Sequence, residues 1–140
     1  MKNFLLVLLL FPAVLFGQKA DPSVYPHKIV MQLTSSDPEV HKGLMKQISN
    51  LTQGWKDSVF IEVVCHGPGI QMLMSGKSTQ AESIKKYHGS TVRFVACENT
   101  LKAKQIPVEE IIPGLDFVMM GIAEIVMKQE QGWSYIKAGY

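Results

Sequence analysis

Short apolar runs alternate with stretches of helical spacing along most of the chain, and this alternation constrains the fold more than any other feature. Apolar residues recur at helical spacing between the runs, as in Val40, Leu44 and Ile48. Such an alternation predicts a parallel sheet covered by helices on both faces and joined by right-handed crossovers. The five runs with the length and composition of strands are residues 27–33, 58–67, 91–97, 115–121 and 133–138.

A chain of 140 residues with this pattern argues for one domain. We predict a single flavodoxin-like, three-layer α/β domain over residues 26–138, with a mostly parallel five-stranded sheet. At this size we expect the strand order 2-1-3-4-5. Four methionines in or beside apolar runs are expected in the core, namely Met72, Met74, Met119 and Met120.

The first 18 residues differ in composition from the rest of the chain. Lys2 precedes an apolar run from Phe4 to Phe16, and Gly17 follows it. The run is shorter than the ~20 residues that span a bilayer, and its layout is typical of a secretory signal peptide. We predict a signal peptide over residues 1–18, cleaved between residues 17 and 20, and a protein that is periplasmic or secreted. The alternative is an uncleaved membrane anchor. No stable membrane insertion is expected after cleavage.

Charge and residue spacing exclude several classes of function. Without residues 1–18 the net charge is about +1, too small to favour nucleic acid or an anionic membrane as a partner. The four histidines lack the spacing of metal ligands, so no metal site is predicted. Pro68 lacks the N–H that a phosphate loop would use in "GPG" (67–69). We therefore predict no cofactor.

Cys97 lies where the third predicted strand ends and a short helix begins, in "TVRFVACENTLK" (91–102). Ligands of parallel sheets bind beyond the carboxyl ends of the strands, at a switch point that the expected order places between strands one and three. Ser35, just after strand one, belongs to the same edge. A helix N-terminus favours a thiolate, whereas the charge of Glu98 opposes it. Position alone leaves open a functional thiol and a small buried apolar residue.

Three segments resemble the DsrE/DsrF-like family of small sulfur-relay proteins. They are "EVVCHGPGI" (62–70), "VRFVACENTL" (92–101) and the C-terminal "GIAEIVMKQEQGWSYIKAGY" (121–140). The match is to a branch with an H-G-P-G turn and an A-C-x-N-T-L strand end, over about residues 27–138. The resemblance implies a flavodoxin-like fold, a homo-oligomer and a persulfide carried by Cys97. Glu98, where many members of the branch have glycine, and the predicted export both depart from the family pattern.

Two further residues near this edge have alternative interpretations. Cys65 ends the second strand, and an intervening strand one would separate it from Cys97 by ~9–10 Å. That is too far for a disulfide, so a buried Cys65 is favoured over a resolving thiol. His66 follows directly and either binds a ligand or caps the turn formed with Gly67 and Gly69.

Two functions from different classes fit these observations. The first is an exported sulfur carrier, in which Cys97 accepts sulfane sulfur from a donor protein and passes it to an acceptor protein. The second is a non-catalytic module that binds a small ligand or a protein in the same strand-end cleft. Residues expected to line the cleft are His66, Gly67, Gly69, Asn99 and Ser35, with Asn99 also predicted to cap the third helix. The short helices and the apolar last strand predict self-association.

Overall fold

The computed structural model describes residues 26–89 and 91–139, so the predicted signal peptide lies outside the described part of the chain. Five strands form one sheet in which every neighbouring pair is parallel. They are β1 (His27–Leu33), β2 (Val59–Cys65), β3 (Val92–Cys97), β4 (Asp116–Val118) and β5 (Ser134–Lys137). The strand order is β4-β3-β2-β1-β5. The predicted α/β class and parallel sheet are confirmed.

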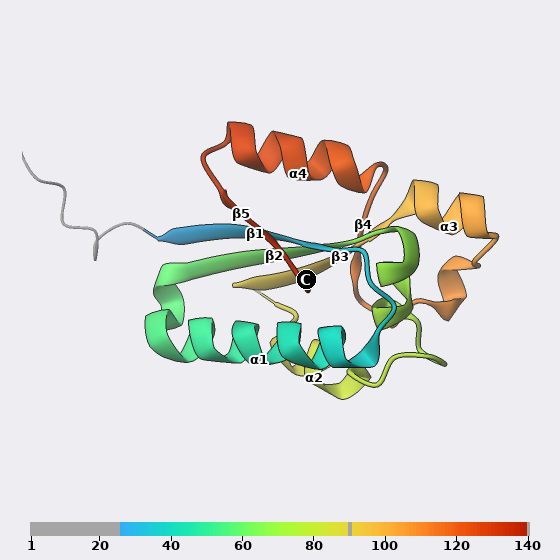
Figure 1. The fold of residues 1–140 in the computed structure, drawn as a ribbon, viewed down its shortest axis with the longest axis horizontal. Helices are drawn as coiled ribbons and strands as arrows, with labels where there is room; N and C mark the ends of the chain where they lie inside the picture. Colours follow the sequence, from blue (N-terminus) through green and yellow to red (C-terminus); the bar gives the residue numbers. More distant parts are fainter. Residues whose placement is uncertain (1–25, 90, 140) are drawn as a thin grey trace, which may run out of the picture.

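Helices cover the two faces of the sheet unequally (Figure 1). The α-helices are α1 (Pro38–Trp55), α2 (Ala81–Tyr87), α3 (Glu98–Lys104) and α4 (Gly121–Glu130), and the 3-10 segments are η1 (Lys56–Ser58), η2 (Gly67–Leu73) and η3 (Val108–Glu110). Helices α1 and α2 lie on one face of the sheet, and α4 lies on the other. None of the helices in the described residues is long and apolar enough to cross a membrane.

The expected strand order 2-1-3-4-5 is wrong. From β1 to β4 the chain moves across the sheet in one direction, and only the connection through α4 returns, to place β5 beside β1. Both orders produce the same alternation of strands and helices along the sequence. The pattern therefore predicts the layers but does not distinguish which strand neighbours which.

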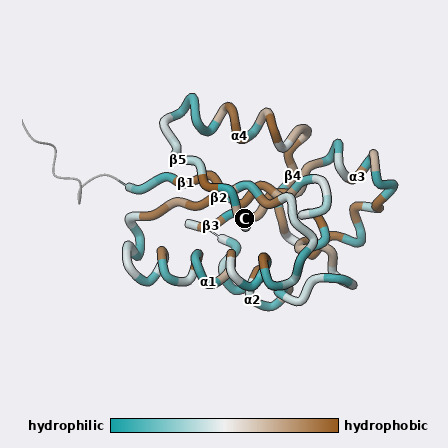
Figure 2. The backbone as a smooth tube through the Cα atoms, viewed as in Figure 1, coloured by the Kyte–Doolittle hydropathy of each residue, from teal (hydrophilic) through white to brown (hydrophobic). Residues whose placement is uncertain are grey.

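Most of the hydrophobic core lies between the sheet and helices α1 and α2. On this side, residues of β1, β2 and β3 pack against Leu44 and Ile48 of α1 and Ile84 of α2. The central strands are accordingly coloured largely as hydrophobic in Figure 2. The face under α4 has a much smaller core, which consists of Val30, Val64, Val95 and Ile125. The helix α4 is therefore held by few apolar contacts.

Strand β4 is much shorter than the run that predicted it. It pairs with β3 through three residues, the last of which is Val118 opposite Cys97. The chain then leaves the sheet, so Met119 is 71% exposed and Met120 is 48% exposed. The prediction that these two methionines belong to the core is wrong, because the strand is a short edge strand. Met72 and Met74 are buried as expected.

Candidate functional site

Cys97 lies at the carboxyl edge of the sheet, where the chain leaves two neighbouring strands toward opposite faces. After β3 the chain enters α3, whose Leu101 packs in the larger core. After β4 it enters α4 on the other face (Figure 1). The switch point of this sheet therefore lies between β3 and β4 rather than between strands one and three. Cys97, at the end of β3, lies at the switch point in both the expected and the observed strand order.

The sulfur of Cys97 faces α4 and the start of two helices. Cys97 follows Val95 by two residues on β3, and Val95 packs in the small core with Ile125 of α4. The N–H of Gly121, the first residue of α4, donates to the Cys97 Sγ at 3.2 Å. Cys97 is also the N-cap residue of α3. The N-terminal ends of α3 and α4 thus converge on one thiol.

The surroundings of the thiol favour its ionised form. Partial burial acts to raise the pKa of Cys97, but hydrogen bonds from the Thr100 hydroxyl and from the N–H groups of Gly121, Thr100 and Asn99 lower it. The donors prevail, and the pKa of Cys97 lies below that of an ordinary thiol. Glu98, in the first turn of α3, is half-buried.

Thr100 connects the thiol to the H-G-P-G turn. The N–H of Gly67 donates to the Thr100 Oγ1 at 3.0 Å, which leaves the hydroxyl proton for the Cys97 sulfur. Gly67 has a φ of +53°, a conformation that glycine adopts at little cost. Gly69 packs on β1 so closely that a β-carbon would lie 2.2 Å from the Leu33 carbonyl oxygen. The conformation of Gly67 and the close packing of Gly69 therefore account for both glycines of the turn.

Gly121 is a site residue that the sequence pattern did not identify. A β-carbon on Gly121 would lie 3.1 Å from Val64 Cγ1, 3.2 Å from His66 Cβ and 3.4 Å from Cys97 Cβ. The start of α4 therefore rests directly on the site, between the side chains of His66 and Cys97. The glycine lies just before the helical spacing that predicts α4, and the sequence gives no local sign of its contact with β3.

His66 is held beside this position by a row of hydrogen bonds across the sheet. The Gln32 side-chain amide donates to His66 Nε2, with the two nitrogen atoms 2.8 Å apart. The Tyr135 hydroxyl donates to Gln32 Oε1. Because Nε2 accepts, the neutral ring carries its proton on Nδ1. Burial lowers the pKa of His66, which keeps the ring neutral at pH 7.

The structure separates Ser35 from Cys97 and changes the position of Asn99. Ser35 follows β1, with β2 between it and β3, and its Oγ accepts a hydrogen bond from the Asp37 N–H at 3.1 Å. Asn99 is the second residue of α3 and not its cap, because the helix begins at Glu98. The Asn99 N–H is shared between the Cys97 sulfur and the Met119 carbonyl oxygen, which lies 3.1 Å from the nitrogen, and so ties α3 to the connection before α4.

Cys65 and Cys97 end neighbouring strands, but their side chains lie on opposite faces of the sheet. The predicted intervening strand is absent, because β2 and β3 are neighbours and Cys65 pairs with Ala96. Cys65 points into the larger core, where burial raises the pKa of its thiol strongly. Both cysteines are thiols. Their opposite directions, rather than their separation, account for the absence of a disulfide between them.

Within residues 26–89 and 91–139, no group of three histidine, cysteine, aspartate or glutamate side chains is arranged to hold a metal ion. The candidate site thus contains one thiol of lowered pKa, Cys97, and the neutral imidazole of His66. Its hydrogen-bond donors come mainly from the starts of α3 and α4.

Comparison with known proteins agrees with this fold. The sequence model of the DsrE/DsrF-like family matches residues 28–138. The structure is similar to that of MTH1491, a protein of unknown function from Methanobacterium thermoautotrophicum, with a TM-score of 0.74 and 32% sequence identity. This match covers 79% of the present chain and 98% of the MTH1491 chain. No curated protein matches the chain.

Proposed function

The chain belongs to the DsrE/DsrF-like family, and from this premise we propose that it carries sulfane sulfur as a persulfide on Cys97. The observation that carries the proposal is the set of N–H and O–H donors around the Cys97 sulfur. A thiolate is the nucleophile in sulfur exchange, and the same donors stabilise the thiolate when it is the leaving group. A carrier needs both properties, because it accepts sulfur in one step and releases it in the next.

The proposed reaction consists of two exchanges without net oxidation. In the first, the Cys97 thiolate attacks the terminal sulfur of a donor persulfide. A new S–S bond forms on Cys97, the donor S–S bond breaks, and the donor leaves as a thiolate with the electron pair. In the second, an acceptor thiolate attacks the terminal sulfur on Cys97, and Cys97 leaves as a thiolate. Each step transfers one sulfur atom and its proton as a unit.

The acceptor thiol comes from another molecule in this proposal. Cys65, the second cysteine of the chain, points into the core on the opposite face of the sheet. It therefore cannot attack a persulfide on Cys97 without rearrangement of β2 or β3. The proposal accordingly requires a sulfur donor and a sulfur acceptor, and proteins that present a persulfide or a thiol are the partners that suit both steps.

We assign His66 the role of orienting the transferred sulfur. Its Nε2 is occupied by Gln32, so the Nδ1–H is the remaining donor of the ring. A neutral imidazole can donate this proton in a hydrogen bond without adding a fixed positive charge. The row that connects His66, Gln32 and Tyr135 holds the ring in place during exchange.

Export and self-association are part of the same proposal. The short apolar run before Gly17 supports export through a cleaved signal peptide. Self-association is supported by exposed apolar side chains on α4 and on the connection before it, where Figure 2 also marks hydrophobic positions. These side chains are Met119, Met120, Ile122, Val126 and Met127.

The second candidate function is a non-catalytic binding module that uses the same edge of the sheet. One observation favours it, namely that Cys97 is only 5% exposed. A thiol that merely lines a cleft needs no access to a sulfur atom on another protein, whereas a carrier does. The two functions therefore differ in whether sulfur moves on and off the protein.

Transfer from the loaded protein distinguishes the two functions. The protein is incubated with a persulfide donor, separated from it, and mixed with a thiol acceptor. We expect the wild type and Cys65→Ser to deliver sulfane sulfur to the acceptor and Cys97→Ser to deliver none. Equal delivery by Cys97→Ser, or none by the folded wild type, contradicts the carrier and leaves the binding module.

A further inference from the structure

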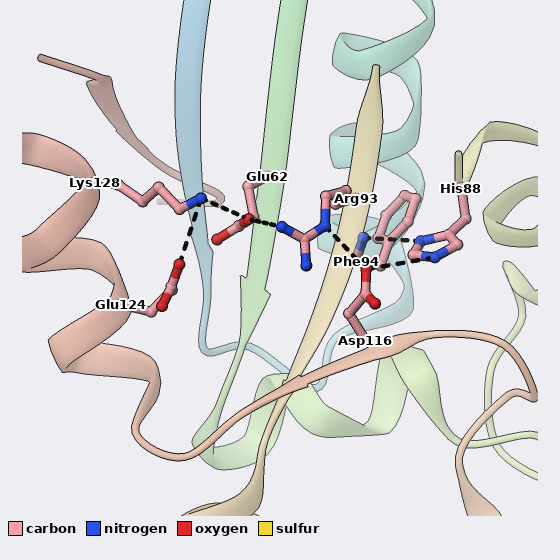
Figure 3. A network of polar contacts seen from close by, with 7 residues as sticks. All are labelled: Glu62, His88, Arg93, Phe94, Asp116, Glu124 and Lys128. Atoms are coloured by element: carbon pink, nitrogen blue, oxygen red, sulfur yellow. Dashed lines mark hydrogen bonds and ion pairs between the residues drawn. The ribbon is translucent and has the colours of Figure 1, made fainter. Parts of the chain in front are cut away.

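A row of charged side chains crosses the sheet beneath α4 (Figure 3). Lys128 of α4 places its Nζ 3.0 Å from Glu62 Oε2 on β2, and Arg93 of β3 places its Nη1 3.2 Å from the same oxygen. The Nε of Arg93 lies 2.9 Å from Asp116 Oδ2 on β4. Glu62 is 1% exposed, so this is a buried carboxylate with two cations and not a surface ion pair.

Further groups surround the same carboxylate. The Lys128 Nζ also lies 3.4 Å from Glu124 Oε1 and 4.5 Å from the centre of the Trp133 ring. The second oxygen of Glu62, Oε1, is buried without a hydrogen-bond partner among the described residues. Burial raises the pKa of Glu62, Lys128 opposes this effect and Glu124 adds to it. His88 extends the row, with its Nε2 3.7 Å from Asp116 Oδ2.

The same face of α4 reaches both this row and the thiol. Gly121, Glu124, Ile125 and Lys128 are spaced at i, i+3, i+4 and i+7, which places them on one side of the helix. Gly121 and Lys128 are about 10 Å apart along the helix axis. Between them only Ile125 enters the small core under α4. The helix is thus fixed on the sheet at two polar points, Gly121 at Cys97 and Lys128 at Glu62.

We propose that Glu62 is a positioning residue, which through Lys128 fixes α4 on the sheet and thereby holds the Gly121 N–H at the Cys97 sulfur. This inference rests on the proposed function of Cys97. Glu62 lies on β2 four residues before His66 and acts through the helix rather than on the sulfur. If α4 shifts or turns by a small amount, its first N–H no longer points at the thiol, while the rest of the domain keeps its core on the other face.

The pH dependence of Cys97 alkylation tests this role in the full-length chain. We compare the wild type, Glu62→Gln, Lys128→Gln and the double variant Glu62→Gln/Lys128→Gln, and peptide mass analysis identifies the alkylated cysteine. The midpoint of the rate profile should move to higher pH in all three variants. At a pH below the wild-type midpoint, we expect alkylation to slow roughly tenfold, the effect of losing one hydrogen bond to a thiolate.

A matched control removes another ion pair that does not contact α4. Glu82→Gln breaks the exposed pair of Glu82 and Lys85 on α2 and should leave the midpoint unchanged. Lys128→Gln leaves the buried Glu62 carboxylate without its lysine, whereas the double variant leaves neither partner of the pair charged. The double variant should therefore be more stable to urea than Lys128→Gln, while the midpoint of its Cys97 alkylation profile should still be raised. Stability and thiol ionisation therefore change separately if Glu62 acts by positioning.

If the variants fold and their Cys97 alkylation profiles have the wild-type midpoint, the inference is overturned. If a single variant does not fold, the double variant supplies this test. Persulfide loading is measured in parallel on the wild type. A wild type that accepts no sulfur, together with raised midpoints in the variants, rejects the carrier and retains the positioning role of Glu62. A wild type that accepts sulfur, together with unchanged midpoints in the variants, retains the carrier and rejects the positioning role of Glu62.

Discussion

Replacement of Gly121 by alanine tests how closely α4 packs on the thiol. The new β-carbon would lie 3.1 Å from Val64 Cγ1, 3.2 Å from His66 Cβ and 3.4 Å from Cys97 Cβ. Carbon atoms at optimal contact are about 3.5–4.0 Å apart, so the helix start or its neighbours must move by a few tenths of an ångström. Val64 is fully buried in the small core and has little space to yield.

The expected destabilisation follows from two opposing effects. Overpacking of this kind costs about 1–3 kcal/mol. Alanine is better than glycine in a helix interior by at most about 1 kcal/mol, and the gain is smaller at the first helical residue. We therefore expect Gly121→Ala to lower the free energy of unfolding by about 1–2 kcal/mol. The shift should also lengthen the Gly121 N–H to Cys97 Sγ contact, now 3.2 Å, and raise the pKa of the thiol.

Urea unfolding and Cys97 alkylation measure the two effects separately. Gly43→Ala in α1 is the matched control, because no heavy atom lies within 4 Å of its added β-carbon. That variant should be more stable than the wild type by about 0.5–1 kcal/mol and should be alkylated at the wild-type rate. If Gly121→Ala is as stable as Gly43→Ala and has the wild-type alkylation profile, α4 does not pack on the thiol as closely as described.

Three further predictions concern the thiol and the surface of α4. Thr100→Val should slow Cys97 alkylation because the hydroxyl that joins Gly67 to the sulfur is lost, and Thr100→Ser should restore the rate; equal rates in all three proteins would contradict this link. The folded state lowers the pKa of Cys97, so the free energy of unfolding of the wild type should rise relative to that of Cys97→Ser as pH rises from the lowered pKa to the ordinary thiol value near 8.5. Acidification should remove this gain. Urea unfolding under reducing conditions measures the difference between the two proteins, and a difference that stays constant with pH would refute the prediction. Val126→Lys, in the exposed apolar part of α4, should shift the protein toward the monomer in sedimentation; a monomeric wild type over a wide concentration range would rule out self-association through this surface.

The layers of the fold could be predicted from the sequence because they depend on local patterns. The spacing of Val40, Leu44 and Ile48 defines α1, and Asp37 with Pro38 defines its start, where the Asp37 side chain accepts from the Glu39 N–H at 2.9 Å. Because the crossovers are right-handed, the strand order depends on which face of the sheet each helix covers, and both orders share one sequence pattern. The position of Cys97 at the carboxyl edge of the sheet does not depend on the order, because the carboxyl ends of all parallel strands lie at that edge.

The residues that set the chemistry of the thiol depend on long-range contacts. Gly121 is 24 positions from Cys97, and no local pattern connects them. Glu62 interrupts an otherwise apolar run, a sign that a buried acid needs a partner, but Arg93 and Lys128 lie far along the chain. The predicted separation of the two cysteines is wrong for the same reason, because it depends on a strand order in which β1 lies between β2 and β3.

The mass of the protein after exposure to a sulfane-sulfur donor tests the central claim most directly. The wild-type chain should gain the mass of one sulfur atom, and digestion should locate that atom on the peptide that contains Cys97. Cys65→Ser should gain the same mass, and folded Cys97→Ser should gain none. A wild type that stays unmodified, or sulfur located on Cys65, would contradict the proposal that Cys97 carries sulfur.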